Sequence, residues 1–349
     1  MLLQISERLL ARTVLQRSSP KARPSVTSIE TIIRKLGRNR LGVAISLLIF
    51  AVATLALYYA LRDIDVGKVM AALRAQPRRA ICIASAFVVA GYVTLIFYDV
   101  FALRTIGHGA VPFRVAAVAS FTSYTIGHAL GAATLTGGFV RLRIYSAWGL
   151  GVIDIAKIAF VTGMTFWLGN ALVLGSVLCY APQAASAVDR LPSWVNLVIG
   201  FCSLFGLGAY LICLVPARRI VGYSTWRIAL PNASLTLIQI GIGAADLCLV
   251  TGAMYTLLPD MPPVGFASVM IIFLTATLIG TVSHVPGNLG IIEAAMLIGL
   301  PQFEKEELLA SLLTFRILYF AVPLLFALLA LALRELGLVA RPPTTSLRS

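Results

Sequence analysis

The stretch Ser283-His284-Val285-Pro286-Gly287-Asn288-Leu289-Gly290 interrupts a chain that is otherwise strongly hydrophobic. An apolar run over residues 264–285 leads into it, and a similar break, Thr136-Gly137-Gly138, follows an apolar run over residues 115–135. Helices broken by Gly or Pro at membrane depth persist only where protein or a water-filled cavity satisfies the freed backbone groups. The two breaks therefore predict a cavity, with each run forming a re-entrant helical hairpin.

The composition places the chain in a membrane. Hydrophobic residues make up 59% of the 349 residues and charged residues 12%, whereas soluble domains carry about 25% charged residues. Runs of about 20 apolar residues can each cross roughly 30 Å of hydrocarbon, and only helices satisfy their own backbone there. The runs cover 41–61, 80–103, 115–135, 153–180, 194–215, 230–258, 264–285 and 308–333. We predict an all-α polytopic protein with about six full spans plus the two re-entrant hairpins.

Charge in the connections predicts the domain boundaries and the orientation. Residues 1–40 form a basic tail, 41–335 the transmembrane domain and 336–349 a second tail. Because Lys and Arg favour the cytoplasmic side, we expect both tails there. The net charge of +14 is then better explained by anionic lipid headgroups than by nucleic acid. The basic loop over 62–79 opposes this orientation, and we expect it to form an amphipathic surface helix.

The two interrupted regions also resemble each other. Four residues of the first recur in the second at an offset of about 153 positions: Phe113, Thr122, Ile126 and Gly127 match Phe266, Thr275, Ile279 and Gly280. Counting spans gives the repeats, over about 80–180 and 230–333, opposite senses in the membrane. Inverted repeats with broken helices are the architecture of many secondary transporters.

Charged residues inside the apolar runs are the candidate functional residues, because each costs roughly 2.5–3.5 kcal/mol in hydrocarbon on insertion scales. They must therefore share a polar interior. The set is Asp99, Arg141, Arg143, Asp154, Lys157, Asp246, Glu293 and Arg316, with His128 and His284 beside the breaks.

Several of these residues have a structural explanation that competes with a functional one. Asp99 either forms an interfacial pair with Arg104 or belongs to a site. Asp154 and Lys157, three residues apart on a helix, either neutralise each other or take part in function. Asp246 lies far from either interface, which favours function.

The residues beside the breaks leave similar alternatives. Arg141 and Arg143 follow Gly137-Gly138, where free N–H groups and two guanidinium groups would make a phosphate site; the alternative is anchoring on the cytoplasmic side. His284 and Glu293 form either a proton-sensitive gate or a structural pair. Arg316 needs an acidic partner, for which Glu293 or Asp246 is available.

Motifs for catalysis are missing from the sequence. It contains no P-loop, no H-E-x-x-H and no G-x-S-x-G, so we expect neither catalytic residues, metal nor cofactor. Gly241 and Gly243 lie inside an apolar run and predict close helix packing rather than a dinucleotide site.

Two blocks carry a resemblance to a known family. The first extends from Thr136-Gly137-Gly138-Phe139-Val140-Arg141-Leu142-Arg143 to Gly169, and the second from Ser283 to Glu293, with Asn288 where the family usually has Gly. Over about residues 40–335 the chain resembles the flippase half of the MprF proteins, the lysylphosphatidylglycerol synthase transmembrane family. The resemblance implies a bacterial inner-membrane protein that moves aminoacylated phosphatidylglycerol outward and lowers sensitivity to cationic antimicrobial peptides. We expect no synthase activity, because the transferase domain has no counterpart here.

The expected mechanism combines guanidinium and carboxylate groups at one headgroup site. Arg141 and Arg143 would bind phosphate, and Asp246 and Glu293 would bind amines, with Arg316 nearby. Export of a cationic headgroup would be coupled to protons through Asp246 or through His284 and Glu293. The gate would comprise His284, Pro286, Gly287, Asn288, Gly137, Gly138, Asp154 and Lys157. The alternatives are a membrane subunit that presents lipid to a separate synthase, a transporter of another lipid or glycolipid, and a homo-oligomer of either.

Overall fold

A computed structural model describes residues 65–335 except 131–132, 216–219 and 224–225. All of these residues belong to one compact unit, Leu48–Ser349. The predicted tails 1–40 and 336–349 and the predicted first span, 41–61, lie outside the described residues.

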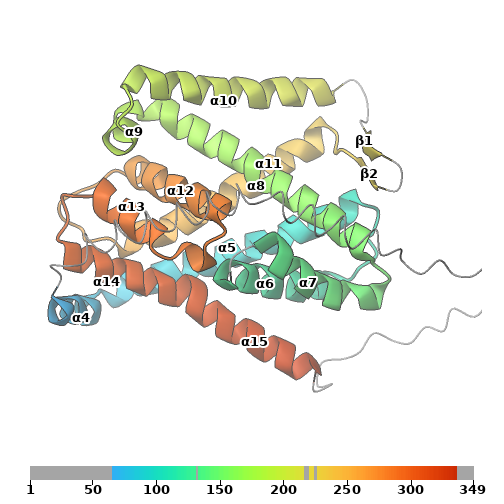
Figure 1. Ribbon diagram of the computed structural model, residues 1–349, viewed down its shortest axis with the longest axis horizontal. Coiled ribbons are helices and arrows are strands. Elements are labelled where there is room, and N and C mark those ends of the chain that lie inside the picture. Colours follow the sequence, from blue (N-terminus) through green and yellow to red (C-terminus); the bar gives the residue numbers. More distant parts are fainter. Residues whose placement is uncertain (1–64, 131–132, 216–219, 224–225, 336–349) are drawn as a thin grey trace, which may run out of the picture. The chain divides into compact units, whose positions relative to one another are not determined.

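Helices form almost all of the described chain, which confirms the prediction of an all-α membrane protein (Figure 1). The longer helices are α4 (Val66–Ala75), α5 (Arg78–Thr105), α6 (Phe113–Leu130), α7 (Ala133–Tyr145), α8 (Val152–Tyr180), α9 (Pro182–Asp189), α10 (Ser193–Leu214), α11 (Ala233–Leu257), α12 (Phe266–Ser283), α13 (Ile291–Gly299), α14 (Lys305–Arg316) and α15 (Val322–Glu335). Three short helical segments are η1 (Ser146–Trp148), η2 (Pro286–Asn288) and η3 (Ile317–Ala321).

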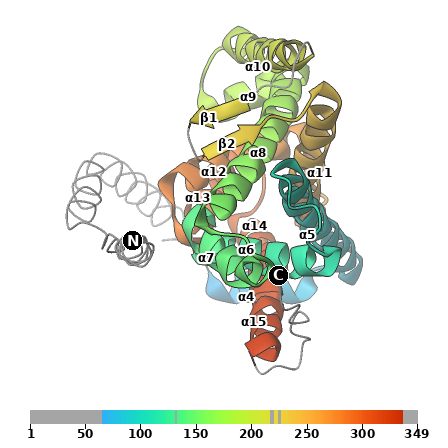
Figure 2. The ribbon, with the colours of Figure 1, turned by 90° about the vertical axis from the view of Figure 1, so that its right-hand side faces the viewer.

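A small antiparallel hairpin was not predicted. Strands β1 (Ile220–Tyr223) and β2 (Trp226–Ala229) pair so that Ile220 faces Ala229 and Tyr223 faces Trp226. The hairpin connects α10 to α11 and lies beside α8 (Figure 2). Its position between two spans is consistent with a connection outside the hydrocarbon, where water can satisfy open strand edges.

Six described helices are long and apolar enough to cross a membrane. Five coincide with predicted full spans, namely α5, α8, α10, α11 and the continuous helix α14–η3–α15. The sixth is α12, which the sequence assigns to the first arm of a hairpin; its 18 residues correspond to roughly 27 Å at 1.5 Å per residue. All five full spans predicted within the described residues are therefore present as long apolar helices.

The same order of elements occurs twice. A long helix, a helical hairpin and a second long helix appear as α5, α6–α7 and α8, and again as α11, α12–α13 and α14–α15 (Figure 1). The first arms α6 and α12 both have 18 residues, and they start at Phe113 and Phe266, the two residues that match in sequence. Two long helices, α8 and α10, lie between α5 and α11 in the chain, so spans that alternate in direction give α5 and α11 opposite directions.

The ends of the spans agree with the predicted grouping of basic loops. Successive spans cross in opposite directions. One end of the helices therefore carries the end of α5, the start of α6, the β hairpin and the end of α15. Helix α4 lies at the other end, beside the start of α14, and it has no buried residue. The predicted surface helix in the loop over 62–79 is therefore confirmed.

The break in the first hairpin is not where the sequence placed it. Gly137 and Gly138 lie inside α7, which begins at Ala133, three residues after α6 ends at Leu130. A Cβ atom on Gly137 would lie 3.0 Å from the carbonyl oxygen of Ser123 on α6. The glycine therefore serves the close approach of the two arms, and the prediction of a turn with free N–H groups at Gly137-Gly138 is wrong.

The second hairpin breaks where predicted. After α12, the backbone takes positive φ at His284, Gly287, Asn288 and Gly290, and the single turn η2 separates α12 from α13. Pro286 starts that turn, as expected for a residue with fixed φ and no N–H. The side chain of Asn288 packs on Gly280, where a Cβ atom would lie 2.4 Å from the Asn288 amide carbon.

Helix α11 is packed against both α5 and α8. It crosses α8 at Gly243 and Gly169, where a Cβ on Gly243 would lie 2.3 Å from the Thr165 carbonyl oxygen. A Cβ on Gly241 would meet nothing within 4 Å. The prediction of close helix packing is therefore confirmed for Gly243, and Gly241 has no part in it. Beside the crossing, the buried Gln239 side chain donates to the Val161 carbonyl at 3.1 Å.

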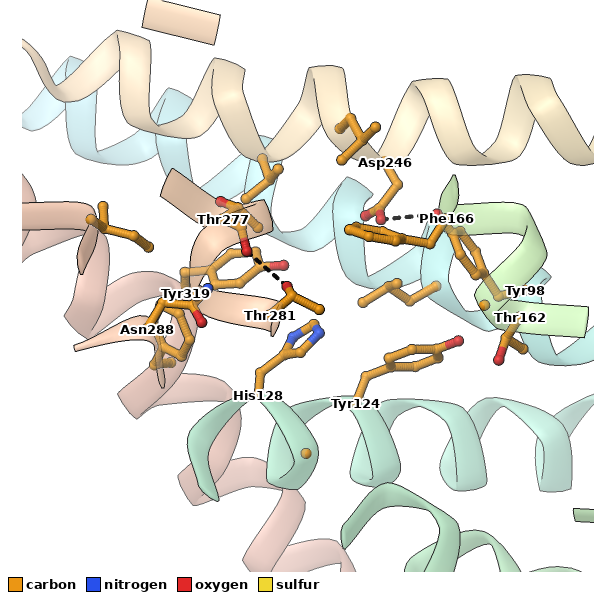
Figure 3. A pocket seen from close by; sticks show the side chains of 18 of the residues that line it. Tyr98, Tyr124, His128, Thr162, Phe166, Asp246, Thr277, Thr281, Asn288 and Tyr319 are labelled. Carbon is orange, nitrogen blue, oxygen red and sulfur yellow. Dashed lines mark hydrogen bonds between the residues drawn. The ribbon is translucent and has the colours of Figure 1, made fainter. Parts of the chain in front are cut away.

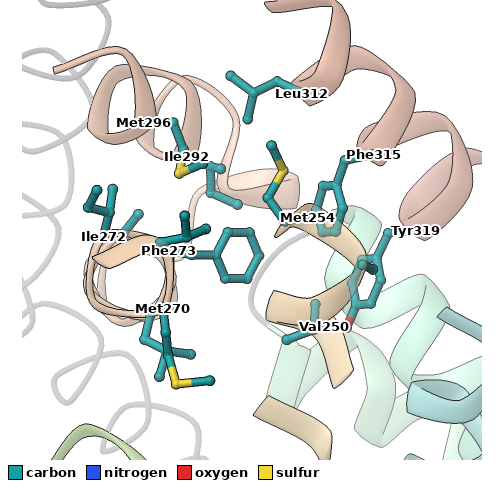
Figure 4. Packing of buried hydrophobic residues seen from close by; sticks show 14 of the residues in the cluster. Val250, Met254, Met270, Ile272, Phe273, Ile292, Met296, Leu312, Phe315 and Tyr319 are labelled. Atoms are coloured by element: carbon teal, nitrogen blue, oxygen red, sulfur yellow. The ribbon is translucent and has the colours of Figure 1, made fainter. Parts of the chain in front are cut away.

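Large apolar side chains join α11, α12, α13 and α14 into one core (Figure 4). The ring of Phe273 meets that of Phe315 edge-on, with centroids 5.5 Å apart. Met254 and Met296 are fully buried, and flexible thioethers suit the irregular gaps between crossing helices. This core fixes the base of the second hairpin against the last long helix.

The last long helix widens locally where it passes the core. Its central segment, η3, is π-helical, and Pro323 follows it without an N–H for the Tyr319 carbonyl four residues earlier. The Tyr92 hydroxyl donates to that carbonyl at 3.0 Å. A side chain of α5 thus donates to an acceptor that has lost its usual donor four residues later.

Candidate functional site

A cavity of about 310 Å³ lies between the two hairpins. Its walls come from α5, α6, α7, α8, α11, α12, η2, α13 and the segment Phe315–Phe320, so both repeats contribute. In Figure 3, Tyr124 and His128 extend from α6 toward Asp246 on α11 and Thr281 on α12. The cavity predicted from the breaks in the sequence is therefore present, and Arg141 and Asp246 both line it.

Asp246 places a carboxylate in the cavity wall. Its side chain is 8% exposed, and the Tyr98 hydroxyl donates to Oδ2 at 3.2 Å. No Lys, Arg or His of the described chain forms an ion pair with it. A buried acidic group without a basic partner is costly in a membrane, so this position is suited to a cation that enters from the cavity.

Aromatic rings surround this carboxylate. Tyr98 meets Tyr124 edge-on at 6.0 Å, and His128 stacks on Tyr319 at 6.2 Å with an interplanar angle of 18°. Phe166 lies beside the carboxylate in Figure 3 and also lines the cavity. The faces of such rings attract cations, so the carboxylate and the rings favour the same class of ligand.

Arg141 is already paired. Its Nη2 donates to Asp99 Oδ1 at 2.7 Å and its Nε to Oδ2 at 3.0 Å, and the Tyr145 hydroxyl donates to Oδ2 at 2.9 Å. The guanidinium also lies 4.6 Å from the centre of the Tyr124 ring. The alternative of an Asp99–Arg104 pair is therefore wrong, and a phosphate at Arg141 would have to compete with a fully buried carboxylate.

Arg316 has the acidic partner that the sequence demanded, and that partner is Glu293. Its Nη2 donates to Glu293 Oε2 at 2.8 Å and its Nε to Oε1. Its Nη1 donates to the Gly287 carbonyl at 2.9 Å, while Glu293 accepts from the Gly290 N–H at 2.9 Å. The pair therefore holds the turn between α12 and α13; neither residue lines the cavity.

The remaining predicted residues are distributed around the cavity or lie away from it. His284 and Asn288 line it, but His284 Nδ1 lies 2.9 Å from the Val282 carbonyl oxygen rather than pairing with Glu293. Arg143, in the last turn of α7, is exposed and is not part of the cavity wall.

Asp154 and Lys157 lie near the start of α8, outside the cavity wall. Asp154 accepts from the Gly151 N–H at 3.0 Å and approaches His108 at 3.7 Å. The two residues form no ion pair with each other. Mutual neutralisation is therefore wrong, and Asp154 serves as a cap of its own helix.

Charge alone did not reveal the uncharged part of the site. Tyr98, Tyr124 and Tyr319 form much of its wall, and Thr277 and Thr281 add hydroxyl groups. The sequence feature that could have identified these residues is the placement of Tyr inside apolar runs, because a phenol there needs a hydrogen-bond partner. In the part of the chain described, no group of three or more His, Cys, Asp or Glu could hold a metal ion.

Comparison with known proteins identifies relatives that share most of the chain. No family model matches. "Uncharacterized protein slr0712" of Synechocystis sp. is 31% identical over 254 residues, covering 72% of this chain and 79% of that protein. "Inner membrane protein YbhN" of Escherichia coli is 29% identical over 299 residues, covering 83% and 90%.

A shorter match connects the chain to a lipid-modifying enzyme. "Phosphatidylglycerol lysyltransferase" of Staphylococcus haemolyticus is 38% identical over 80 residues, which are 22% of this chain and 9% of that protein. The two longer matches and the six apolar helices establish the assignment: the chain belongs to the family of multi-pass inner-membrane proteins that includes slr0712 and YbhN.

Proposed function

We propose that this protein moves a phospholipid with an amine-bearing headgroup across the inner membrane, with the headgroup passing through the cavity between the hairpins. Aminoacylated phosphatidylglycerol, such as the lysyl form, is the substrate we favour. The observation that carries the proposal is Asp246, a buried carboxylate in the cavity wall with no basic partner in the described chain.

The substrate class follows from the chemistry of the wall. An ammonium group that enters the cavity loses its hydration. Ion pairing with Asp246 and contacts with the rings would offset part of that cost in free energy. The hydroxyl groups of Thr277 and Thr281 and the amide of Asn288 offer further polar contacts. The short match to a protein named for phosphatidylglycerol and lysine supports a lipid of this kind.

The expected movement uses the two hairpins. A headgroup enters between them while its acyl chains remain in the lipid, and the repeats rock around the occupied cavity. Arg141 stays locked to Asp99, and Arg316 keeps the η2 turn in shape. The phosphate contact predicted for Arg141 and Arg143 is therefore replaced in the proposal by the amine contact at Asp246.

The test is a lipid-movement assay with the purified full chain in liposomes that contain fluorescent lysyl-phosphatidylglycerol. Asp246→Asn removes the negative charge with almost no change in volume, and we expect a loss of about tenfold or more in rate, since one charge-assisted contact contributes about 1.5–3 kcal/mol. Asp65→Asn is the matched control, because it makes the same chemical change at an exposed cap of α4.

Equal rates in the wild type and Asp246→Asn, at equal protein density, would contradict the proposal. No movement in the wild type under any gradient would favour the alternative of a subunit that presents lipid to a synthase. A contribution to resistance against cationic peptides, which rests on the resemblance to MprF proteins, follows only if outer-leaflet aminoacyl lipid falls in a deletion strain.

Voltage gives a second test of the same transport step. A headgroup of net charge +1 that moves outward against an inside-negative potential climbs about 2.3 kcal/mol per 100 mV. Uncoupled movement therefore leaves a roughly fiftyfold excess on the negative side at that voltage. We expect this distribution in liposomes without a pH gradient, and a shift from it when a proton gradient is added would show that transport is coupled to protons.

A further inference from the structure

A second cavity, of about 580 Å³, lies at the end of the spans near α4. Its walls come from the α4–α5 junction, the end of α11 with the loop that follows, and the first turns of α14. It shares no lining residue with the cavity between the hairpins. Because the spans end here, the cavity faces the region of lipid headgroups rather than the acyl chains.

Charges of both signs line this second cavity without neutralising each other. Arg79 lies on the α5 side, and the carboxylates of Asp260 and Glu307 lie on the other walls. None of the three forms an ion pair with any residue of the described chain. The cavity therefore suits a ligand that carries a negative and a positive group together.

Gln76 adds a demand for a hydrogen-bond donor. Its Nε2 donates to the Leu257 carbonyl at 3.2 Å and to Ser311 Oγ at 3.4 Å, which ties the α4–α5 junction to α11 and α14. Its Oε1 is buried and has no hydrogen-bond partner among the described residues. A buried acceptor without a donor is unfavourable, and an ammonium group in the cavity would satisfy it once a small side-chain shift uncovers Oε1.

We propose that this cavity is a headgroup site for a zwitterionic phospholipid with a primary ammonium group, such as phosphatidylethanolamine. Arg79 binds the phosphate, and Glu307, Asp260 and Gln76 Oε1 receive the ammonium. A quaternary ammonium has no N–H to donate, so phosphatidylcholine is a poor ligand. The site is independent of the proposed transport step.

The experiment uses the purified full chain carrying Asp246→Asn, which removes the proposed ammonium-binding carboxylate from the cavity between the hairpins. Native mass spectrometry counts bound dioleoyl-phosphatidylethanolamine, -phosphatidylcholine or -phosphatidylglycerol across a concentration series. We expect saturable binding of phosphatidylethanolamine, about tenfold weaker binding of the other two, and about tenfold weaker binding of phosphatidylethanolamine in Arg79→Gln/Glu307→Gln.

The matched control is Arg78→Gln/Glu304→Gln. It removes the same charges one and three residues away, at positions that do not line the cavity, and we expect wild-type binding. Thermal unfolding of both double variants checks that they are folded; if Arg79→Gln/Glu307→Gln is not, Gln76→Leu in its place gives the same readout.

Three results would overturn the proposal: equal binding of phosphatidylcholine, an equal loss in the control, or equally tight binding of glycerophosphoethanolamine, which would mark a site for a free solute. Liposome transport with wild-type Asp246 and the Arg79→Gln/Glu307→Gln change separates this result from the proposed function. Transport of lysyl-phosphatidylglycerol without selective binding of phosphatidylethanolamine contradicts only the second site. Selective binding without any transport contradicts only the proposed function.

Discussion

At the scale of single residues, the pair of Asp99 and Arg141 determines what the cavity can bind. Both side chains are almost fully buried, so neither charge is solvated and each depends on the other. Asp246 differs because its contact is a neutral phenol. The cavity and its immediate surroundings thus contain one cation, Arg141, and two carboxylates, Asp99 and Asp246. One carboxylate is therefore left without a positive partner.

Removing one member of the pair should therefore damage the protein more than removing both. Arg141→Met leaves Asp99 buried and unpaired, and we expect a loss of about 3–5 kcal/mol in stability. Asp99→Leu/Arg141→Met should recover most of that loss. Thermal unfolding midpoints in detergent measure the stability of both variants. A double variant less stable than Arg141→Met would contradict the conclusion that the two buried charges depend on each other.

At the scale of elements, the crossing of α8 and α11 depends on two glycines. Gly169 and Gly243 bring the backbones so close that each would place a Cβ within 3 Å of the other helix. Gly241, two residues away on the same helix, has open space around its Cα. The same helix therefore offers a sensitive position and an insensitive one.

Gly243→Ala should separate the two helices and lower the unfolding temperature, with a cost of about 1–3 kcal/mol, as for other overpacked cores. Gly241→Ala should be neutral or slightly stabilising, because alanine favours helix. Fluorescence-detected size exclusion after heating compares the two at equal expression. Equal losses in both variants would contradict the assignment of the close helix crossing to Gly243.

The turn of the second hairpin is held by a side chain from another element. Arg316→Lys keeps the positive charge but cannot reach Glu293, Gly287 and Asn288 at once, because lysine lacks the planar fork. We expect faster amide exchange over residues 284–290 with little change in α11. Unchanged exchange in that turn would mean that Pro286 and the core alone maintain it.

At the scale of the whole molecule, the sequence predicts best the features that depend only on the length and order of its apolar runs. Runs of apolar residues predicted the spans, and the matches beginning at Phe113 and Phe266 predicted the repeat, because both follow from length and order. The first break was misplaced because Gly137 signals close packing as readily as a turn.

Partner choice among buried charges could be predicted only in part. Arg316 had two acidic candidates, and the structure selects Glu293. The Asp99–Arg141 pair joins residues 42 positions apart, so its formation depends on how α6 packs against both α5 and α7, which no local pattern encodes. The aromatic wall was missed for the same reason, since a tyrosine in an apolar run has no fixed direction until its neighbours are placed.

The equal length of α6 and α12 has a consequence for how this protein can vary. One residue inserted early in α6 would rotate everything beyond it by about 100°, and Tyr124 and His128 would then face α7 or lipid. The number of residues in each arm is thus constrained as strictly as their chemistry, and natural insertions should collect in the connections outside the arms.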